Sequence, residues 1–387
     1  MSAVKVGVIG VGNMGRSHAR KLNQGKVKGA VLTAVCDASE QQIEWVKNNI
    51  TDDIDLYQDE DRFLNEADID AIIIATPHYF HPTTAMKAFD KGIHVMLEKP
   101  AGTYAKNVKE MNEAAAESGL VFSMMYNQRT HPLYQKLRKM IHSGELGDIK
   151  RTNWIITDWY RSQSYYDSSE WRATWDGEGG GVLLNQAPHQ LDLWQWTTGL
   201  MPKKVHAFVS LGKYHDIEVE DDVTAYVEYE NGATGVFITS TGEAPGTNRF
   251  EITGDRGKIV VENNKLIFYR LTESERKFNA TDKTGFGRPE CWEIEIPVKG
   301  DYPGHLGILQ NWMDAIHNGT PLLAPGTEGI KGLEISNAIY LSAWLEKTVE
   351  LPVDPDLYLE NLQAKIKQST FQKKEIANVT LDVEKSH

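Results

Sequence analysis

Lys99 and His189 are the two side chains whose type and setting best suit the transfer of a proton. Lys99 lies in the tripeptide Glu98-Lys99-Pro100, at the end of an apolar run that predicts a buried strand. The unperturbed pKa of histidine, about 6.5, makes His189 a suitable base near neutral pH, and burial can lower the pKa of a lysine enough for it to share the proton. Taken alone, His189 is better explained as a core histidine. The presence of Lys99 favours a catalytic role.

A glycine loop near the start of the chain has the spacing that binds a dinucleotide. The residues Gly10-Val11-Gly12-Asn13-Met14-Gly15 lie between an apolar strand pattern and a helix that is expected to begin near Met14. In such a loop the first glycine makes the tight turn, the second lets the pyrophosphate approach the backbone, and the third lets helix and strand pack closely. The helix N-terminus then offers unpaired N–H groups to the phosphates. A glycine turn without a ligand is the alternative.

A carboxylate follows the second predicted strand. Asp37 comes 22 residues after Gly15, near the usual spacing for a group that hydrogen-bonds the adenosine ribose hydroxyls. It would repel a 2′-phosphate, and Ala38 and Ser39 supply no arginine to hold one, so we expect NAD rather than NADP. The alternative is that Asp37 caps the helix starting near Glu40, a role that Ser39 could fill equally well.

Two later strand ends should border the crevice in which the nucleotide is expected to bind, because ligands of open α/β folds bind outside the carboxyl edge of the sheet. They are Thr76-Pro77-His78 and Glu98-Lys99-Pro100. Thr76 and Pro77 are expected to shape the backbone beside the cofactor, whereas His78 and His81 could equally be helix-entry residues. The peptide bond before Pro100 is expected to be trans, with cis as the alternative.

A second glycine-rich segment would place Asn185 and His189 on one face if it is helical, because the two positions are four residues apart. The glycines Gly179-Gly180-Gly181 permit a turn that other residues resist, and Pro188 fits a helix only within its first turn. Upstream, the aromatic and basic stretch 158–181 could hold a sugar ring, although its members could equally belong to the core or to an interface. The candidates are Arg161, Tyr165, Tyr166, Arg172 and Trp175.

The elements that must position these residues alternate between strand and helix over the first third of the chain. This alternation is typical of a parallel sheet covered by helices on both faces. The predicted strands are Val4–Ile9, Val31–Cys36, Ala71–Ala75, His94–Leu97 and Val121–Met125. The predicted helices are Met14–Leu22, Glu40–Asn48, Thr83–Lys91 and Val108–Glu117.

After about Asn127 the pattern changes to long strands that alternate apolar and polar residues, which predicts an antiparallel sheet with one face covered and one more open. Turn signals at 231–232 and 255–257 fall between strands, as hairpins require. The predicted strands are Asp148–Thr157, Lys204–Leu211, Val223–Glu230, Thr234–Thr241, Arg249–Thr253, Lys258–Glu262 and Lys265–Leu271. The predicted helices are Pro132–Ser143, His189–Thr198, His305–Asn318 and Thr327–Lys347. The last 30 or so residues are expected to form a peripheral tail without a functional signal, with a short helix near Tyr358–Lys367.

Length and composition limit the class of protein. At 387 residues, 41% hydrophobic and 25% charged, the chain is expected to form two globular domains. Its formal net charge of −13 disfavours nucleic acid and anionic membranes as partners. Cys36 and Cys291 have no disulfide or metal-ligand spacing, so no metal site is expected and a reducing compartment fits. Without a membrane-spanning apolar run or a dispensable signal peptide, we expect a cytoplasmic protein.

In their order along the chain, the glycine loop, Asp37, Glu98-Lys99-Pro100 and the segment 179–192 resemble the glucose-fructose oxidoreductase / inositol dehydrogenase (Gfo/Idh/MocA) family over nearly the whole length. The resemblance implies an α/β fold with an N-terminal Rossmann domain, residues 1–126, and a C-terminal α/β domain, residues 127–387, built on a large, mostly antiparallel open sheet that often forms the dimer interface. It also implies that Lys99 and His189 work beside the nicotinamide. One position departs from the pattern: many sugar dehydrogenases of the family have aspartate where this chain has Asn185, and asparagine can orient a hydroxyl but cannot take a proton.

Together these features predict an NAD-dependent oxidoreductase that transfers a hydride between the nicotinamide and a secondary alcohol of a sugar, glycoside or cyclitol. A glucose-like ring is favoured, and its C3 hydroxyl is one of the open positions. The expected partners are that small molecule and further copies of the chain, in a homodimer or homotetramer through the C-terminal sheet. Two alternatives are open: a glycoside hydrolase that uses NAD for transient oxidation, and a sugar-sensing regulator without catalysis. Retention of both Lys99 and His189 argues against the regulator.

Overall fold

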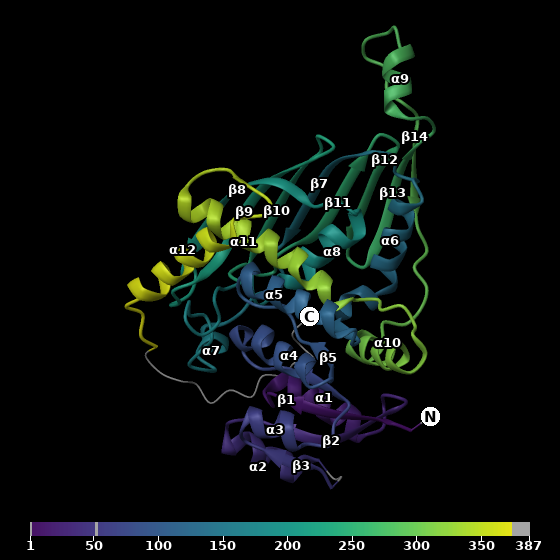
Figure 1. Ribbon diagram of the computed structural model, residues 1–387. Helices are drawn as coiled ribbons and strands as arrows, with labels where there is room; N and C mark the ends of the chain where they lie inside the picture. Colours follow the sequence, from purple (N-terminus) through teal and green to yellow (C-terminus); the bar gives the residue numbers. More distant parts are fainter. Residues whose placement is uncertain (1, 51–52, 374–387) are drawn as a thin grey trace.

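The computed structural model describes residues 2–50 and 53–373 and contains two sheets with helices packed on them (Figure 1). The smaller sheet is built from strands between residues 4 and 124, and the larger one from strands between residues 149 and 350. The chain is therefore an α/β protein, as predicted. The boundary proposed between residues 126 and 127 falls between the two sheets along the chain and stays a prediction.

The smaller sheet is parallel throughout, with the strand order β3-β2-β1-β4-β5-β6. This is the order of the Rossmann fold, in which ligands bind outside the carboxyl ends of the strands where the strand order reverses. Every residue of β4 is buried, as expected for a central strand covered on both faces. The strands are β1 (Val4–Ile9), β2 (Ala30–Cys36), β3 (Asp55–Tyr57), β4 (Ala71–Ile74), β5 (His94–Leu97) and β6 (Phe122–Met124). The helices are α1 (Asn13–Asn23), α2 (Glu40–Asn49), α3 (Glu60–Glu66), η1 (His78–Phe80), α4 (His81–Asp90) and α5 (Ala105–Ser118).

The sequence pattern missed β3 and α3. β3 is a three-residue strand at the sheet edge, and none of its residues is buried. α3 has seven residues, of which only Phe63 and Leu64 are buried. Both elements are too short for a hydrophobic period to show, because such a period needs about 11 residues to be read.

The larger sheet has nine strands in the order β14-β13-β12-β11-β7-β10-β9-β8-β15. All neighbouring pairs are antiparallel except β7 and β10, which run parallel, so the sheet is mixed but mostly antiparallel, as predicted. The strands are β7 (Ile149–Ile156), β8 (Pro202–Leu211), β9 (Glu220–Tyr229), β10 (Thr234–Ser240), β11 (Asn248–Gly254), β12 (Gly257–Glu262), β13 (Lys265–Leu271), β14 (Cys291–Glu295) and β15 (Val349–Glu350). The helices are η2 (Asn127–Thr130), α6 (Pro132–His142), α7 (Gln163–Tyr166), α8 (Pro188–Thr198), α9 (Glu275–Thr281), α10 (Gly304–Asn318), η3 (Gly326–Glu328), α11 (Gly329–Leu345) and α12 (Pro355–Gln368).

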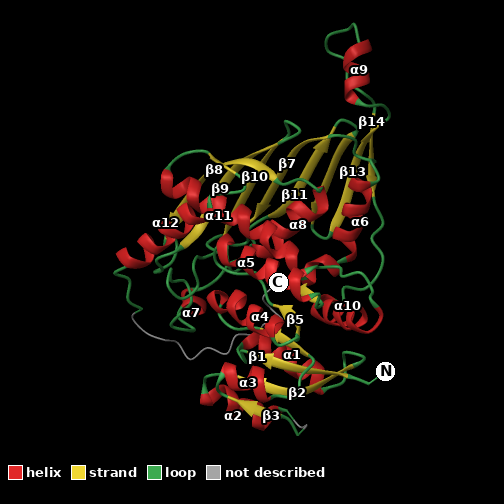
Figure 2. Cartoon of the chain, viewed as in Figure 1, coloured by secondary structure: helices red, strands yellow, loops and turns green. Residues whose placement is uncertain are grey.

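Helices cover one face of the larger sheet and leave the other more open (Figure 2). Every residue of α8 is buried, and α11 packs on both α8 and β8. Along β9 buried residues alternate with exposed ones, as expected when only one face is covered. On the open face Phe208 of β8 is 68% exposed and Tyr226 of β9 is 42% exposed. The predicted one-sided sheet is therefore confirmed.

The prediction of a peripheral C-terminal tail is wrong for the described residues up to Lys373. Tyr358 and Leu362 of α12 are buried, and the ring of Tyr358 stacks on Trp344 of α11 with centroids 5.4 Å apart. The Lys373 ammonium group donates hydrogen bonds of 2.5 Å to the carbonyl oxygens of Tyr166 and Ser169. This end of the chain is thus part of the folded body, whereas α9 projects beyond the sheet and has no buried residue (Figure 1).

Candidate active site

The glycine loop between β1 and α1 has the shape that a pyrophosphate needs. Gly10 has φ +86°, and a Cβ there would lie 2.6 Å from the Ala75 backbone, while a Cβ on Gly15 would lie 1.8 Å from the carbonyl oxygen of Gly10. A Cβ on Gly12 would meet no atom within 4 Å. No side chain caps α1, which begins at Asn13, so a ligand could accept hydrogen bonds from its first N–H groups. The first and third glycines are thus required by packing, and the second leaves room for a ligand.

Asp37 lies beside this loop at the end of β2. One carboxylate oxygen accepts a hydrogen bond of 2.6 Å from the Val11 N–H, and the other accepts one of 2.8 Å from the Ser39 N–H. Neither Asp37 nor Ser39 caps α2 through its side chain, so the capping alternative is not what the geometry shows. At the end of β4, the buried Thr76 hydroxyl has no hydrogen-bond partner among the described residues, which fits a place beside a bound nucleotide.

His81 joins the ends of two strands of the smaller sheet. Its ring nitrogens lie 2.8 Å from the Thr76 carbonyl oxygen and 2.7 Å from that of Pro100, and it is the first residue of α4. His78 begins η1, and its Nδ1 lies 3.3 Å from the carbonyl oxygen of Glu178 in the second half of the chain. Burial lowers the pKa of both histidines. His81 therefore has the structural role of a helix-entry residue, while a cofactor contact for His78 stays a prediction.

Glu98 is held by a buried hydrogen-bond contact with a histidine of α1. His18 Nε2 lies 2.7 Å from Glu98 Oε1, and the His18 ring lies 5.9 Å from that of His305. Burial disfavours the Glu98 carboxylate, but His18, His305 and Lys99 together outweigh this effect and lower the pKa of Glu98 to about 2. The peptide bond between Lys99 and Pro100 is cis, which was the less expected alternative. His18 was not predicted as a site residue, because local sequence patterns do not show which residue of α1 faces the end of β5.

Lys99 connects the two halves of the candidate site. Its ammonium group donates a 2.8 Å hydrogen bond to the backbone carbonyl oxygen of Asn185, across a separation of 86 residues. Burial lowers the pKa of Lys99, and the negative charges of Glu98 and Glu178 act in the opposite direction. A partly desolvated ammonium group between two carboxylates can donate a hydrogen bond and can release a proton more readily than a lysine in water.

His189 lies in the first turn of α8, which begins at Pro188 as the proline rule predicted. It is buried, and its ring lies 6.3 Å from that of Tyr126 in an edge-to-face arrangement. Asn185 precedes the helix, in a turn where its N–H donates to the Gly181 carbonyl oxygen at 3.0 Å. The condition under which Asn185 and His189 would share a helical face is therefore not met, because Pro188 starts the helix and the residues before it form turns.

Glu178, which the sequence analysis did not single out, is a buried carboxylate in this site. One of its oxygens accepts a hydrogen bond from the Asn185 side-chain amide, and the other accepts a 2.6 Å bond from the Ala173 N–H. The Arg172 guanidinium lies 3.6 Å from the first oxygen and donates a 2.7 Å hydrogen bond to the Tyr165 hydroxyl. The one available signal for Glu178 was an acidic residue directly before the glycines 179–181.

The predicted aromatic and basic residues partly gather around Lys99. The Arg172 guanidinium lies 4.4 Å above the Tyr165 ring, and that of Arg161 lies 5.3 Å from the same ring. The Tyr165 hydroxyl also accepts a 3.1 Å bond from the Gln186 amide. The positive charges of Arg172 and Arg161 act on Lys99, which places all three near one another. These residues can supply donors and one aromatic face to a polyhydroxylated ring.

Trp175 and Tyr166 belong to the core rather than to this cluster. Trp175 is 3% exposed, and its ring lies 5.9 Å from Tyr340 and 5.7 Å from Trp344 of α11. Tyr166 is 2% exposed and shares a 2.6 Å hydrogen bond with Thr241. Their burial favours the core alternative that the sequence analysis left open, and the substrate contact predicted for Trp175 lacks support from its position.

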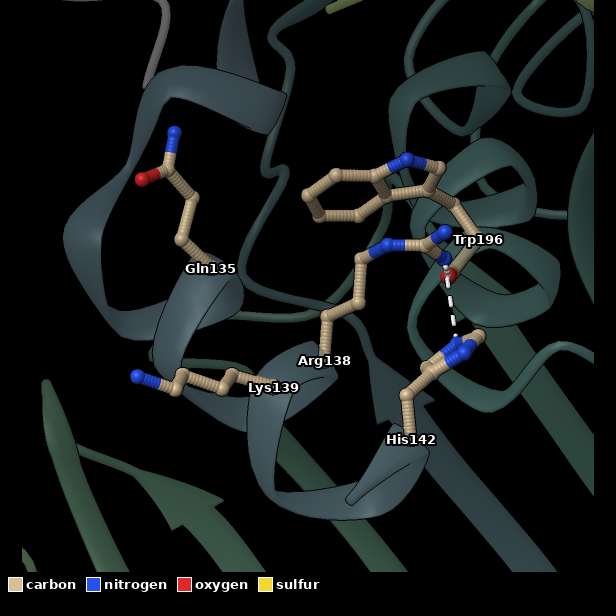
Figure 3. Close-up of a pocket in the computed structure, with 5 residues that line it drawn as sticks. All are labelled: Gln135, Arg138, Lys139, His142 and Trp196. Atoms are coloured by element: carbon tan, nitrogen blue, oxygen red, sulfur yellow. Dashed lines mark hydrogen bonds between the residues drawn. The ribbon is translucent and has the colours of Figure 1, made fainter.

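A surface hollow of about 270 Å³ lies away from the candidate site, at the other end of α8 (Figure 3). There Arg138 donates to the carbonyl oxygen of Trp196 and lies 3.1 Å from His142, so these side chains of α6 satisfy the C-terminal end of α8. The contacts of Arg138 and His142 in this hollow are therefore explained by their role at the end of a helix, without a ligand. Its lining residues are Gln135, Arg138, Lys139, His142 and Trp196.

Within residues 2–50 and 53–373, no group of three or more histidine, cysteine, aspartate or glutamate side chains could hold a metal ion. The same part of the chain contains no helix that is long and apolar enough to cross a membrane. Both cysteines are free thiols: Cys36 is buried and Cys291 is exposed.

Comparison with known proteins agrees with this geometry. Levoglucosan dehydrogenase of Pseudarthrobacter phenanthrenivorans is 26% identical over 324 residues, which cover 75% of this chain and 82% of that protein. Myo-inositol 2-dehydrogenase of Thermotoga maritima is 23% identical over 355 residues, or 90% of this chain and 98% of that protein. The crystal structure of the WlbA dehydrogenase from Bordetella pertussis, in complex with NADH and UDP-GlcNAcA, has a TM-score of 0.76 and 25% identity and covers 91% of this chain and 100% of that chain.

Two family matches cover most of the chain. Residues 4–126 match the oxidoreductase family with an NAD-binding Rossmann fold, and residues 134–260 match the Gfo/Idh/MocA C-terminal domain. The first match contains the glycine loop, Asp37 and Lys99, and the second contains Glu178, Asn185 and His189. The chain therefore belongs to the Gfo/Idh/MocA family of NAD(P)-dependent oxidoreductases.

Proposed function

We propose that this protein is an NAD-dependent dehydrogenase that interconverts a secondary alcohol and a ketone on a sugar, glycoside or cyclitol, with a glucose-like ring as the favoured substrate. The observation that carries the proposal is the 2.8 Å hydrogen bond from Lys99 to the Asn185 carbonyl oxygen, which brings the end of β5 together with the segment leading to His189. The relatives named levoglucosan dehydrogenase and myo-inositol 2-dehydrogenase support a polyhydroxylated ring as the substrate class.

The proposed roles follow from the chemistry of each side chain. His189 takes the proton of the substrate hydroxyl, because a neutral imidazole is the best-matched base near neutral pH. Lys99 donates a hydrogen bond to the same substrate oxygen, and the Asn185 side chain holds a neighbouring hydroxyl. The nicotinamide, when bound, supplies the redox chemistry by exchanging a hydride with the carbinol carbon. Arg161, Tyr165 and Arg172 orient the ring.

NAD rather than NADP is the proposed cofactor. The loop fits a dinucleotide because Gly12 leaves open space where a pyrophosphate would approach. Asp37 is fixed beside the loop by the Val11 N–H, so its negative charge would face the 2′ position of the adenosine ribose. A carboxylate can accept hydrogen bonds from ribose hydroxyls and repels a 2′-phosphate.

Two alanine variants test the catalytic assignment. Lys99→Ala and His189→Ala, shown to be folded and to bind NAD as the wild type does, should each lose at least about 10²-fold in turnover. Lys109→Ala serves as the control, because Lys109 is a surface lysine of α5 that pairs with Glu334. Near-normal turnover in both site variants would contradict the assignment.

A substrate screen tests the reaction class. Polyols, free aldoses and glycosides are incubated with the enzyme and NAD, and NADH is followed by its absorbance at about 340 nm. Formation of NADH with one class identifies a dehydrogenase. Cleavage of a glycoside without net NADH would instead indicate a hydrolase with transient oxidation, and binding of a sugar without any turnover would indicate a regulator.

We also propose that the open face of the larger sheet joins copies of the chain into a homodimer or homotetramer. Phe208 and Tyr226 are large apolar side chains on that face, on the paired strands β8 and β9, and exposed apolar patches mark association sites. The double variant Phe208→Lys/Tyr226→Lys should reduce the molar mass measured by light scattering. An unchanged mass would exclude this face as the interface.

A further inference from the structure

Glu178 is a buried carboxylate whose contacts lie inside the candidate site. Glu178 is 1% exposed, and a charged group that is buried to this degree must find partners within the protein. A carboxylate present only to balance Arg172 would be expected to bond it directly, but that ion pair spans 3.6 Å. The two Glu178 oxygens instead accept hydrogen bonds from the Asn185 side-chain amide and from the Ala173 N–H.

The backbone around Glu178 is held in an uncommon conformation. Ala173, the residue whose N–H donates to Glu178 at 2.6 Å, has φ +55°, in the left-handed region that non-glycine residues rarely adopt. Such a conformation costs of order 1 kcal/mol and persists only where surrounding contacts fix it. The segment that carries Glu178 is therefore fixed by this bond.

The contact with Glu178 determines how Asn185 faces a substrate. An ionised carboxylate can only accept hydrogen bonds, so the amide NH₂ of Asn185 must point to Glu178. The amide oxygen then points the other way and can only accept. The backbone carbonyl oxygen of Asn185 accepts at the same time from Lys99 at 2.8 Å. Glu178, Asn185 and Lys99 thus form one connected chain of hydrogen bonds.

From this geometry we infer that Glu178 is the positioning residue of the proposed site, because it orients the Asn185 amide to accept a hydrogen bond from a substrate hydroxyl. Glu178 also supplies the negative charge near Lys99 that an aspartate at position 185 would otherwise supply. The inference rests on the proposed function. It also explains how the chain tolerates asparagine at position 185, because the carboxylate is kept in the site on the preceding loop. Removal of the Glu178 charge lowers the pKa of Lys99, because that charge raises it in the wild type.

The first test is Glu178→Gln, which keeps the shape and removes the charge. The wild type should lose kcat/KM at alkaline pH as Lys99 deprotonates, and in the variant this loss should begin at lower pH. Turnover at the optimum should fall by about tenfold, because a misplaced polar group weakens the alignment of the reactants. Glu220→Gln is the matched control, since Glu220 is a buried carboxylate that accepts a hydrogen bond from the Leu183 N–H of the same loop and is not among the charges that act on Lys99.

The second test exchanges the two side chains. In Glu178→Gln/Asn185→Asp the amide and the carboxylate change places, so the hydrogen bond and the net charge are both kept. The alkaline loss of activity should return toward its wild-type position. Asn185→Leu, which removes the amide but leaves Glu178 and the Lys99 contact to the backbone, should raise the KM for the sugar by about tenfold without moving the alkaline loss. If Glu178→Gln does not fold, Asn185→Leu still tests whether the Asn185 amide binds the substrate.

The pH at which Lys99 loses its proton can be measured without following turnover. Trace acetylation of the folded protein at a series of pH values, with the Lys99 peptide quantified by mass spectrometry, should show Lys99 becoming reactive at lower pH in Glu178→Gln than in the wild type. An unchanged Lys99 titration and an unchanged pH profile would overturn the inference. If Lys99→Ala keeps its turnover while the Lys99 titration still shifts in Glu178→Gln, the proposed catalytic role fails and the Glu178–Lys99 coupling stands.

Discussion

Glu220 should make the folded protein less stable as the pH rises from about 4.5 to 7. This glutamate is the first residue of β9 and is fully buried. It accepts hydrogen bonds from the Leu183 N–H at 2.9 Å, from the Gly181 N–H at 3.0 Å and from the Tyr340 hydroxyl at 2.7 Å. Burial nevertheless outweighs these bonds and raises the pKa of Glu220 from 4.5 to about 7.

The sign and size of the effect follow from linkage between proton binding and folding. Below pH 4.5 Glu220 is protonated in both states; between pH 4.5 and 7 the unfolded chain releases the proton and the folded protein retains it, which favours unfolding. At about 1.4 kcal/mol per pH unit, the free energy of unfolding should fall by about 3 kcal/mol over this interval. Glu220→Gln keeps the acceptor oxygen and carries no charge, so it should lack this contribution.

Urea unfolding of both proteins at pH 4.5 to 8, followed by tryptophan fluorescence, measures the difference. Nine of the ten tryptophans follow residue 127, so the signal reports mainly on the part of the chain that contains Glu220. Other titrating groups cancel in the comparison between wild type and variant. If the two stability curves run parallel over this pH range, Glu220 titrates as it does in water, and the reasoning from its burial is refuted.

Three further predictions concern the nucleotide side of the site. Gly12→Ala should fold normally but bind NAD at least about tenfold more weakly, as measured by isothermal titration. Gly15→Ala should instead lower the thermal melting temperature, because only its Cβ would meet backbone, at 1.8 Å from a carbonyl oxygen. Asp37→Ser should raise the ratio of NADP to NAD activity by about tenfold or more, and an unchanged ratio would remove Asp37 from cofactor choice. His18→Leu should cost about 3 kcal/mol of stability, because it leaves the Glu98 carboxylate buried without its His18 partner, and a denaturation midpoint equal to that of the wild type would contradict this.

Local patterns predicted the nucleotide side of the site well. Gly10, Gly12 and Gly15 lie within six residues, between a strand and a helix that both have clear hydrophobic periods. Their roles depend on backbone geometry, which a short motif specifies. Asp37 could be placed because the end of β2 is adjacent to the end of β1 in any sheet of this topology. The contact between Asp37 and the Val11 N–H follows from that adjacency.

The substrate side was less predictable because its contacts join residues that are far apart in sequence. Lys99 and Asn185 are separated by 86 positions, and the bond uses a backbone carbonyl oxygen, which leaves no trace in the residue types. Glu178 gave only a weak signal beside its glycines. The role of Trp175 stayed open because an aromatic residue in a loop can face a ligand or the core with the same local sequence. Its packing on Tyr340 depends on α11, which follows it by more than 150 residues.

The two halves of the site depend on each other for their geometry. Lys99 comes from the end of β5, and His189 from a helix on the larger sheet, so neither half alone contains the proposed pair. A buried ion pair adds a second connection: Arg129, just after the smaller sheet, donates bonds of 2.8 and 2.6 Å to both oxygens of Asp192 on α8. Such a bidentate pair fixes orientation as well as distance. Because Asp192 lies three residues after His189, the same contact that orients α8 also sets where the imidazole lies relative to the sheet that carries Lys99.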